Sequence, residues 1–367
     1  MIIPNYFPIV GGTENQLRGL VAHLKDDFNI EILTQKYNHL KFEEFVDGIK
    51  VKRIRSIPHL GVLTEFFNSL LMFRYIYVNQ KKIDIIHFHQ GTLLNALISI
   101  LNYKFTGIKS ICKIANSGKK FDLNSIILPF KKQIKKAFIK SINFFVILND
   151  DIKKQLNEIH SNKTINIPNG VNLMKLNSSK FEYPRKIIFS SRLVPQKNIE
   201  VILNYLLYIE NNLKDFEINI YGNGPEYDKL FSIGKSFQKL KLKFINNSRK
   251  PYINFKYGDI FINSSSYEGI SNSLLEAMSC GLVPLVSNIP GNLRVIEDGF
   301  NGFSFNYKSK DSFLKSLNLI INSDKLYKEI SEKSYESIEK EFDFSIVVKK
   351  YKLLYNKLIN EDSQNLL

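Results

Sequence analysis

The chain has few cysteines and no long apolar run. Only two cysteines, Cys112 and Cys280, occur among its 367 residues, which fits a reducing compartment better than a disulfide-stapled secreted domain. The apolar start meets Pro4 at once, so no signal peptide is expected. The longest apolar candidate, residues 93–101, is much shorter than the ~20 residues that cross a bilayer. We therefore predict a cytoplasmic protein.

Metal-binding and nucleotide-binding patterns are missing too. No D-x-D triplet occurs, so the chain has no obvious pair of aspartates for a metal-bound diphosphate, and no G-x-x-x-x-G-K-[ST] loop occurs. His87 and His89 alternate on one strand, but no third ligand lies at the spacing of a zinc site. We therefore expect no metal, and a P-loop nucleotidase is excluded.

Acidic residues are in deficit. The 51 Lys and Arg against 35 Asp and Glu give a formal net charge of +16, which is compatible with nucleic acid, an anionic membrane surface or anionic substrates. Residues 127–145 add a basic amphipathic segment, in which Ile134, Phe138, Ile142 and Phe145 share a face at helical spacing. Lysines occupy the opposite side, namely Lys131, Lys132, Lys135, Lys136 and Lys140. Such a helix either exposes solvated lysines or rests on anionic lipid.

Short apolar runs alternate with helical stretches along most of the chain. Runs such as residues 84–89 and 259–265 are continuously apolar or nearly so, as strands covered on both faces should be. Their alternation with helices predicts α/β domains with parallel, doubly wound sheets. A polar break at 171–185 separates an N-terminal domain, 1–170, from a C-terminal domain, 186–344. The last segment, 345–367, contains an amphipathic helix expected to pack back on the N-terminal domain.

Two glutamates, Glu268 and Glu276, form the most informative pattern of the chain. Residues 267–288 indicate a strand end, a loop, a helix and a further strand, with Glu268 in the loop and Glu276 about two helical turns later. Ligands bind at the carboxyl ends of strands in open α/β sheets. Carboxylates accept hydrogen bonds from hydroxyls, and helix starts favour phosphates. The pattern therefore predicts a ligand with both sugar hydroxyls and phosphates.

The second half adds cations and glycines at other strand ends. Arg192 and Lys197 follow the run 186–191, where two cations could neutralise a diphosphate leaving group. Gly222 and Gly224 end a further strand and permit close backbone approach. The spacing does not continue as G-x-G-x-x-G, so a dinucleotide fingerprint is absent.

The first half contributes a glycine turn and a histidine. Gly11 and Gly12 precede a helix for which Thr13 is the expected N-cap, with Gln16 completing a capping box. The glycines could admit a phosphate or sugar, or form an ordinary turn. His89 lies nearest the carboxyl end of its strand and is better placed than His87 to reach a ligand.

These motifs, in this order and spacing, resemble the retaining glycosyltransferases of family 4. SSRLVPQKN, YGNGPE and YEGISNSLLEAMSCGLVPLVS look like their C-terminal domain, and PIVGGTE, HFHQG and IPNGV look like their N-terminal motifs. The resemblance implies the GT-B fold, with two Rossmann-like domains facing across a cleft. It also implies metal-independent use of a nucleotide-diphosphate sugar, with no cofactor and with retention of configuration.

The resemblance also implies residue roles. Glu276 resembles the glutamate at the donor ribose, Glu268 the one at the transferred sugar, and Arg192 and Lys197 the pair on the diphosphate. His89 resembles the histidine near the reaction centre, and Gly12 the glycine lining the donor pocket. Backbone amides at Ile270, Ser271 and Asn272 are expected to meet the diphosphate or sugar.

The implied function is transfer of a sugar from a UDP- or GDP-sugar to a hydroxyl of a surface glycan or glycolipid precursor, as in lipopolysaccharide or capsule synthesis. The protein would work in the cytoplasm or peripherally on the inner face of the membrane. A nucleotide-sugar epimerase or phosphorylase on a similar fold and a basic nucleic-acid binder are the alternatives. Two departures from the family stand out: Ser271 replaces a common glycine, and the first strand is unusually short, which raises the alternative of a misassigned or truncated start.

Overall fold

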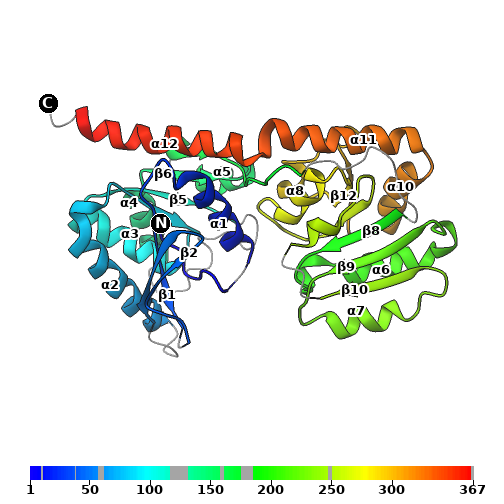
Figure 1. Cartoon of the computed structure of the whole chain (residues 1–367), viewed down its shortest axis with the longest axis horizontal. Coiled ribbons are helices and arrows are strands. Elements are labelled where there is room, and N and C mark those ends of the chain that lie inside the picture. The colour runs from blue at the N-terminus through cyan, green and yellow to red at the C-terminus, as the bar shows by residue number, and fades with distance from the viewer. Residues whose placement is uncertain are drawn as a thin grey trace. The chain divides into compact units, whose positions relative to one another are not determined.

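The structure, a computed structural model, describes residues 1–9, 11–37, 39–56, 62–115, 131–157, 161–174, 185–246 and 250–364. It consists of two compact units (Figure 1). The first combines Met1–Gly170 with Phe344–Leu367, and the second is Val171–Asp343. Each unit is an α/β structure with mainly parallel strands, which confirms the predicted fold class.

Strands of the first unit form two sets, ordered β1-β3-β2 and β4-β5-β6-β7. They are β1 (Glu31–Lys36), β2 (Glu43–Val46), β3 (Ile49–Arg55), β4 (Ile85–His89), β5 (Lys109–Lys113), β6 (Phe144–Ile147) and β7 (Thr164–Asn166). All the pairings are parallel except that between β2 and β3. Ile2 joins the two sets, since it pairs in parallel with Leu33 of β1 and Phe88 of β4.

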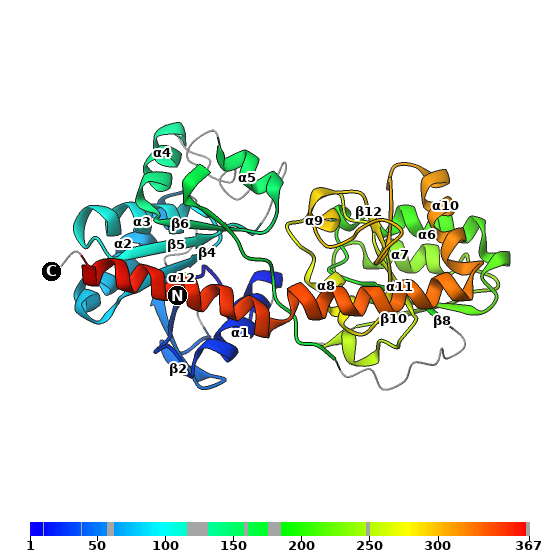
Figure 2. The same cartoon turned by 90° about the horizontal axis from the view of Figure 1, so that it is seen from above.

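Helices cover both faces of these strands. They are α1 (Gly12–Leu24), α2 (Val62–Asn79), α3 (Leu93–Phe105), α4 (Lys131–Ser141), α5 (Asp150–Asn157) and α12 (Phe344–Gln364), with the 3₁₀ turns η1 (Gln80–Lys82) and η4 (Ser161–Lys163). Helices α2, α3 and α4 form a row on one face, and α1 lies beside α12 on the other (Figure 2).

The last helix belongs to the first unit because its apolar stripe completes that unit's core. Val347, Tyr351 and Leu358 are buried against Leu20 of α1 and Ile111 of β5. These positions follow helical spacing, so one face of α12 is apolar, and such a face is stable only against a partner surface. In Figure 1 this red helix lies along the first unit.

The second unit contains one parallel sheet in the order β10-β9-β8-β11-β12-β13. Its strands are β8 (Arg185–Ser190), β9 (Phe216–Tyr221), β10 (Lys241–Ile245), β11 (Ile260–Asn263), β12 (Val283–Ser287) and β13 (Phe303–Phe305). The chain runs outward from β8 to β10 and then returns to β11 on the other side of β8. The strand order therefore reverses between β8 and β11, where open α/β sheets bind their ligands.

The helices of the second unit lie between successive strands or follow the sheet. They are α6 (Ile199–Tyr208), α7 (Tyr227–Gly234), α8 (Asn272–Ser279), α9 (Pro290–Leu293), α10 (Lys310–Ile321) and α11 (Asp324–Ser337). Short 3₁₀ turns are η5 (Pro195–Lys197), η6 (Glu210–Asn212) and η7 (Pro251–Asn254), and η8 (Ile338–Phe342) is a π-helical turn. Aliphatic and aromatic side chains from both helix layers form one core around the sheet.

The structure corrects three local expectations. The segment 127–145 is not one helix, since α4 ends at Ser141 and Phe145 lies in β6. Between them, the Asn143 amide donates to Ser110 O of β5, and the Ser110 amide donates to Asn143 Oδ1. These two bonds align the chain with β5 at the point where β6 begins. Residues 127–130 lie outside the described part of the chain. Arg185 begins β8 and so is not part of a linker; residues 175–184 are also outside the description.

The start of α1 also differs from the expected capping box at Thr13 and Gln16. The N-cap is Gly11, which has no side chain to cap the helix, so Thr13 is not the cap. Gln16 does not close a capping box either. Its side-chain amide instead exchanges hydrogen bonds with the backbone of Gly170, at 2.8 and 3.0 Å. The pair ties the helix start to the end of the unit's first segment.

Candidate functional site

The predicted donor residues of the second unit gather at the carboxyl ends of the strands where the order reverses. Lys197 follows β8 and Glu268 follows β11, and the two strands are neighbours in the sheet. The Lys197 ammonium forms an ion pair with Glu268 Oε1, and both side chains are largely buried. Ser265 Oγ donates a second hydrogen bond to the same carboxylate oxygen, at 2.8 Å. A cation and a carboxylate are thus held together at the switch point.

Hydrogen bonds clip the two loops that carry this pair. Asn198 donates to Ser264 O at 3.1 Å, and Gln196 Nε2 donates to Tyr267 O at 2.7 Å. The Ser266 amide returns a bond to Gln196 O at 2.9 Å. Asn198 has a left-handed backbone, with φ of 49°, which asparagine tolerates better than most residues. Sequence reasoning missed these positioning residues, because their partners are about 70 positions away along the chain.

Gly222 and Gly224 leave room for the backbone of the neighbouring loop, residues 191–193, and do not border an open space. A Cβ at Gly222 would lie 1.9 Å from Ser191 O, and one at Gly224 would lie 2.3 Å from Leu193 O. The Leu193 amide also donates to Asn223 O at 2.9 Å. The predicted close backbone approach is therefore made by residues 191–193, and it fixes the loop that carries the exposed side chain of Arg192.

The start of α8 completes this part of the site. Ser271 is its N-cap, and Ile270 and Ser271 are buried beside it. The first amides of a helix have no partners within the helix and attract anions. Gly291 of α9 packs behind the loop, since a Cβ there would lie 2.5 Å from Glu268 O. Sequence reasoning missed Gly291, although its position after Pro290 was a visible turn signal.

Glu276 lies on α8 and is partly buried. Loss of hydration raises the pKa of Glu276 to about 7, because burial disfavours the charged form. Burial raises the pKa of Tyr252 of η7, and the nearby Glu276 charge adds to that rise. A carboxyl of this kind is well suited to accept hydrogen bonds from a ligand that displaces the remaining water.

The first unit holds His89 and Gly12 at one edge of its own sheet. Gln90 follows His89 with a φ of 79°, and its side-chain Nε2 donates to Thr13 Oγ1 at 2.9 Å, which links the end of β4 to the start of α1. The His89 side chain is only 1% exposed. Its ring packs 4.1 Å from that of His87, and neither of its nitrogens has a hydrogen-bond partner among the described residues. Burial lowers the pKa of both imidazoles.

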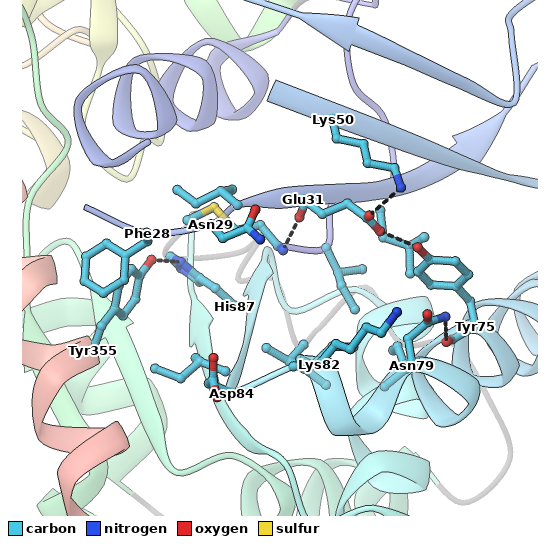
Figure 3. A pocket seen from close by; sticks show the side chains of 18 of the residues that line it. Phe28, Asn29, Glu31, Lys50, Tyr75, Asn79, Lys82, Asp84, His87 and Tyr355 are labelled. Carbon is cyan, nitrogen blue, oxygen red and sulfur yellow. Dashed lines mark hydrogen bonds and ion pairs between the residues drawn. The ribbon is translucent and has the colours of Figure 1, made fainter. Parts of the chain in front are cut away.

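A cavity of 510 Å³ lies at the opposite ends of β1 and β4 from His89 (Figure 3). Its wall includes Glu31, Tyr75, His87 and Tyr355. His87 Nδ1 lies 2.7 Å from the Tyr355 hydroxyl, and the Tyr75 hydroxyl donates to Glu31 at 2.6 Å. None of the predicted donor residues lines this cavity. A much smaller cavity of 10 Å³ lies beside Lys197, Ser191 and Ser265.

Metal-binding clusters and membrane-spanning helices are both absent from the described residues. The described residues contain no group of three or more His, Cys, Asp or Glu side chains that could hold a metal ion. In the same described ranges, no helix combines the length and apolarity needed to cross a membrane. The five predicted membrane-facing lysines lie on α4 (Lys131, Lys132, Lys135, Lys136 and Lys140). Lys140, near the end of that helix, places its Nζ 5.8 Å from the centroid of the Tyr103 ring.

Comparison with known families identifies the two units. Residues 10–175 match the Glycosyltransferase Family 4 model, and residues 174–337 match the Glycosyl transferases group 1 model. The chain belongs to the glycosyltransferases that these two models describe. The resemblance seen in its motifs is thereby confirmed, and the comparisons support a transferase rather than an epimerase or a nucleic-acid binder.

Several curated relatives of this glycosyltransferase match over nearly its whole length. One is the UDP-Gal:alpha-D-GlcNAc-diphosphoundecaprenol alpha-1,3-galactosyltransferase of Escherichia coli, which is 27% identical, with 96% of this chain and 95% of that protein covered. Another is the phosphatidyl-myo-inositol mannosyltransferase of Mycolicibacterium smegmatis, at 22% identity with 95% and 90% covered. Their names state what they act on, which is GlcNAc-diphosphoundecaprenol in the first and phosphatidyl-myo-inositol in the second.

Solved structures show the same fold. Anabaena HepE in complex with UDP and glucose superimposes with a TM-score of 0.73 at 14% identity, covering 97% of this chain and 98% of that one. Sucrose-phosphate synthase from Thermosynechococcus elongatus gives 0.77 at 14% identity, covering 98% and 96%. The similarity confirms the GT-B fold class for this glycosyltransferase.

Proposed function

We propose that this glycosyltransferase transfers a sugar from a UDP- or GDP-sugar to a hydroxyl of a lipid-linked glycan precursor, without a metal ion and with retention of configuration. The observation that carries the proposal is the meeting of Lys197, Glu268 and the start of α8 at the switch point of the second sheet. Such a site offers positive charge to a diphosphate and a carboxylate to sugar hydroxyls. UDP bound to HepE and the lipid-linked substrates in the relatives' names support it.

The proposed reaction breaks the bond between the anomeric carbon and the diphosphate oxygen and forms one between that carbon and the acceptor oxygen. Negative charge grows on the departing diphosphate. Lys197, Arg192 and the amides of Ile270, Ser271 and Asn272 stabilise that charge, which is commonly the largest catalytic contribution. The acceptor attacks from the face that the diphosphate leaves, and its proton passes to a diphosphate oxygen. Glu276 binds the donor ribose, with Gly222 and Gly224 shaping the loop beside it. The roles of Glu268, His89 and Gly12 stay as the family resemblance implies.

The first experiment is thermal unfolding in EDTA with UDP, GDP, ADP or CMP. A ligand at one hundred times its dissociation constant stabilises the folded state by about 2.7 kcal/mol. We expect UDP or GDP to raise the melting temperature by several degrees, and Glu276→Ala to abolish that rise. Glu297→Ala, which changes an exposed carboxylate of the same unit, is the control and should keep it. Absence of a shift with every nucleotide would contradict the donor assignment.

Retention is tested separately by following the anomeric proton of the product by NMR. The proposal expects the donor's anomeric configuration in the first product formed. An inverted product would refute retention while leaving the transferase assignment intact.

A peripheral location on the inner face of the membrane is part of the proposal. Residues Lys132, Lys136 and Lys140 are exposed on α4, which carries no acidic residue. Each lysine near an anionic surface adds about 1 kcal/mol to binding. Changing these three lysines to glutamate should release the protein from anionic vesicles, and binding unaffected by the change would exclude α4 as a contact.

A further inference from the structure

Helix α2 exposes apolar residues on its outer side, where an ordinary surface helix is polar. Its inner side includes the buried residues Asn68 and Ser69 next to Met72 and Ile76. Its outer side is exposed and almost entirely apolar, with Leu63, Phe66, Phe67, Leu70, Leu71, Tyr77 and Val78. These positions recur every three or four residues, so they form one continuous stripe along the helix. The outer side of a surface helix is normally polar.

A hydrogen bond to a residue outside the helix holds α2 in this orientation. Asn68 Nδ2 donates to Ser56 Oγ at 3.0 Å, while Ser69 Oγ is satisfied within the helix by donating to Phe66 O at 2.7 Å. Rotating the helix to bury the phenylalanines would expose Met72 and Ile76 and break the bond to Ser56. The polar groups on the inner side are thus satisfied, as buried polar groups must be, and the apolar stripe is left facing outward.

The stripe continues onto the end of α3, which packs beside α2. Phe105 and Tyr103 of α3 are both exposed. The Phe73 ring lies 6.0 Å from Phe105 and 6.0 Å from Tyr77, so the aromatic rings of the two helices adjoin. We call these two residues and the seven exposed residues of α2 the α2 face. A contiguous exposed apolar surface of this kind marks an interaction site.

Positive charge borders the α2 face. Lys104 lies over the Phe105 ring at 5.2 Å, and Lys140 of α4 lies over the Tyr103 ring at 5.8 Å. Arg74, Lys81 and Lys82 are exposed along and beyond α2, whose one acidic residue is Glu65. Aromatic and aliphatic side chains with lysines at their edge are typical of helices that lie in the plane of an anionic membrane interface.

We propose that the α2 face inserts into the interfacial region of an anionic lipid bilayer, with α2 lying in the membrane plane. The lysine and arginine border would contact headgroup phosphates while the phenylalanines and leucines enter the acyl boundary. The α2 face would thereby bring the first unit to the bilayer that holds the lipid-linked acceptor, so this docking role rests on the proposed function. The docking surface shares Lys140 with the α4 lysines but takes its apolar contacts from α2 and α3.

The first test compares two matched double variants of the full chain. Phe66 and Leu70 of the α2 face are 46% and 39% exposed, and Phe300 and Leu319 of the second unit are 46% and 47% exposed. Binding to vesicles of phosphatidylglycerol and phosphatidylcholine is measured by sedimentation. We expect Phe66→Ser with Leu70→Ser to weaken binding at least tenfold, and Phe300→Ser with Leu319→Ser to leave it unchanged. Equal effects of the two pairs would overturn the proposal.

The second test uses the absence of tryptophan from the chain. Phe67→Trp places a single fluorophore on the α2 face, and Phe300→Trp places one on the second unit. We expect anionic vesicles to shift the emission of the first variant to shorter wavelength and to leave the second unaltered. An unshifted Phe67→Trp variant that binds vesicles would refute insertion.

One outcome would point to another occupant. If the α2 face covers a second copy of the chain, the wild type sediments as a dimer without vesicles and the Phe66 and Leu70 double variant as a monomer, which overturns the lipid assignment. The vesicle assays contain neither donor nor acceptor sugar. Their failure is therefore distinguishable from failure of the proposed transfer, which the nucleotide-induced melting shift tests.

Discussion

At the scale of single residues, sequence reasoning found the charged members of the candidate site but not their supports. Glu268 and Lys197 stand beside strand ends in recognisable motifs, and the structure pairs them. Ser265, Asn198 and Gly291 support them, but their importance depends on which backbone each one meets. That information is tertiary, and no local pattern contains it. The catalytic roles themselves stay predictions.

The Lys197 ammonium gives the sharpest residue-level prediction. Lys197→Ala should reduce turnover by about a hundredfold or more, because it removes charge stabilisation at the departing diphosphate. Stability should fall by only about 1–3 kcal/mol, the cost of leaving the Glu268 carboxylate with fewer partners. The control is Lys243→Ala on β10, which breaks an ion pair with Glu217 of β9, at the edge of the same sheet. Turnover near that of the wild type would rule out the diphosphate role.

Glu276 predicts a pH dependence of stability. Its folded pKa, about 7, lies above the ordinary value of 4.5, so between these pH values the folded state holds a proton that the unfolded state has lost. Stability therefore falls as pH rises through that window. The free energy of unfolding of Glu276→Gln minus that of the wild type should therefore be larger at pH 8 than at pH 5, by up to about 3 kcal/mol. Urea unfolding at the two pH values measures this difference, and a pH-independent difference would contradict it.

At the scale of elements, the strands flanked by helices were predictable and the exceptions have physical causes. Most strands from β4 to β12 were predicted from continuous apolar runs, because burial on both faces makes such runs. The edge strands β7 and β10 are partly exposed. The hairpin of β2 and β3 was missed, although Asp47 and Gly48 form a recognisable turn, with φ of 51° and 81°. Helix α2 escaped notice because a helix with an apolar outer side has no ordinary amphipathic pattern.

The glycine after β9 yields a prediction about loop geometry. Gly222→Ala would drive a Cβ into Ser191 O and so displace the loop that carries Arg192. We expect it to lose more stability than Gly299→Ala and to lose UDP-dependent stabilisation as well. Gly299 also has positive φ, of 77°, but open space around it, so its variant should cost only the about 1–2 kcal/mol of the backbone conformation. Calorimetry with and without UDP separates the two effects.

At the scale of the whole molecule, the two units differ in how the sequence builds them. The second unit is one continuous segment, Val171–Asp343, with its own core. The first is discontinuous, because Phe344–Leu367 returns to it. The sequence predicted that the last helix needs an apolar partner surface, and the structure supplies one on α1, β5 and β6.

This difference predicts how fragments behave. Residues 171–343 expressed alone should unfold cooperatively and keep nucleotide binding, since their core is complete. Residues 1–170 alone should show no cooperative transition, because a cluster of that unit's core lacks its α12 side chains. Adding residues 344–367 as a separate peptide should restore order to the larger fragment. Circular dichroism melts of the three samples decide the matter, and cooperative folding of 1–170 alone would contradict the expectation.

The return of α12 also sets the order of events during synthesis. The ribosome completes the 173 residues of the second unit (171–343) before it makes the helix that closes the first. At about 5–20 residues per second, the growing chain would carry an uncovered apolar face on α1, β5 and β6 for roughly 10–35 seconds. The N-terminal unit, although made first, would finish folding last, and in that interval it would depend on chaperones to avoid aggregation.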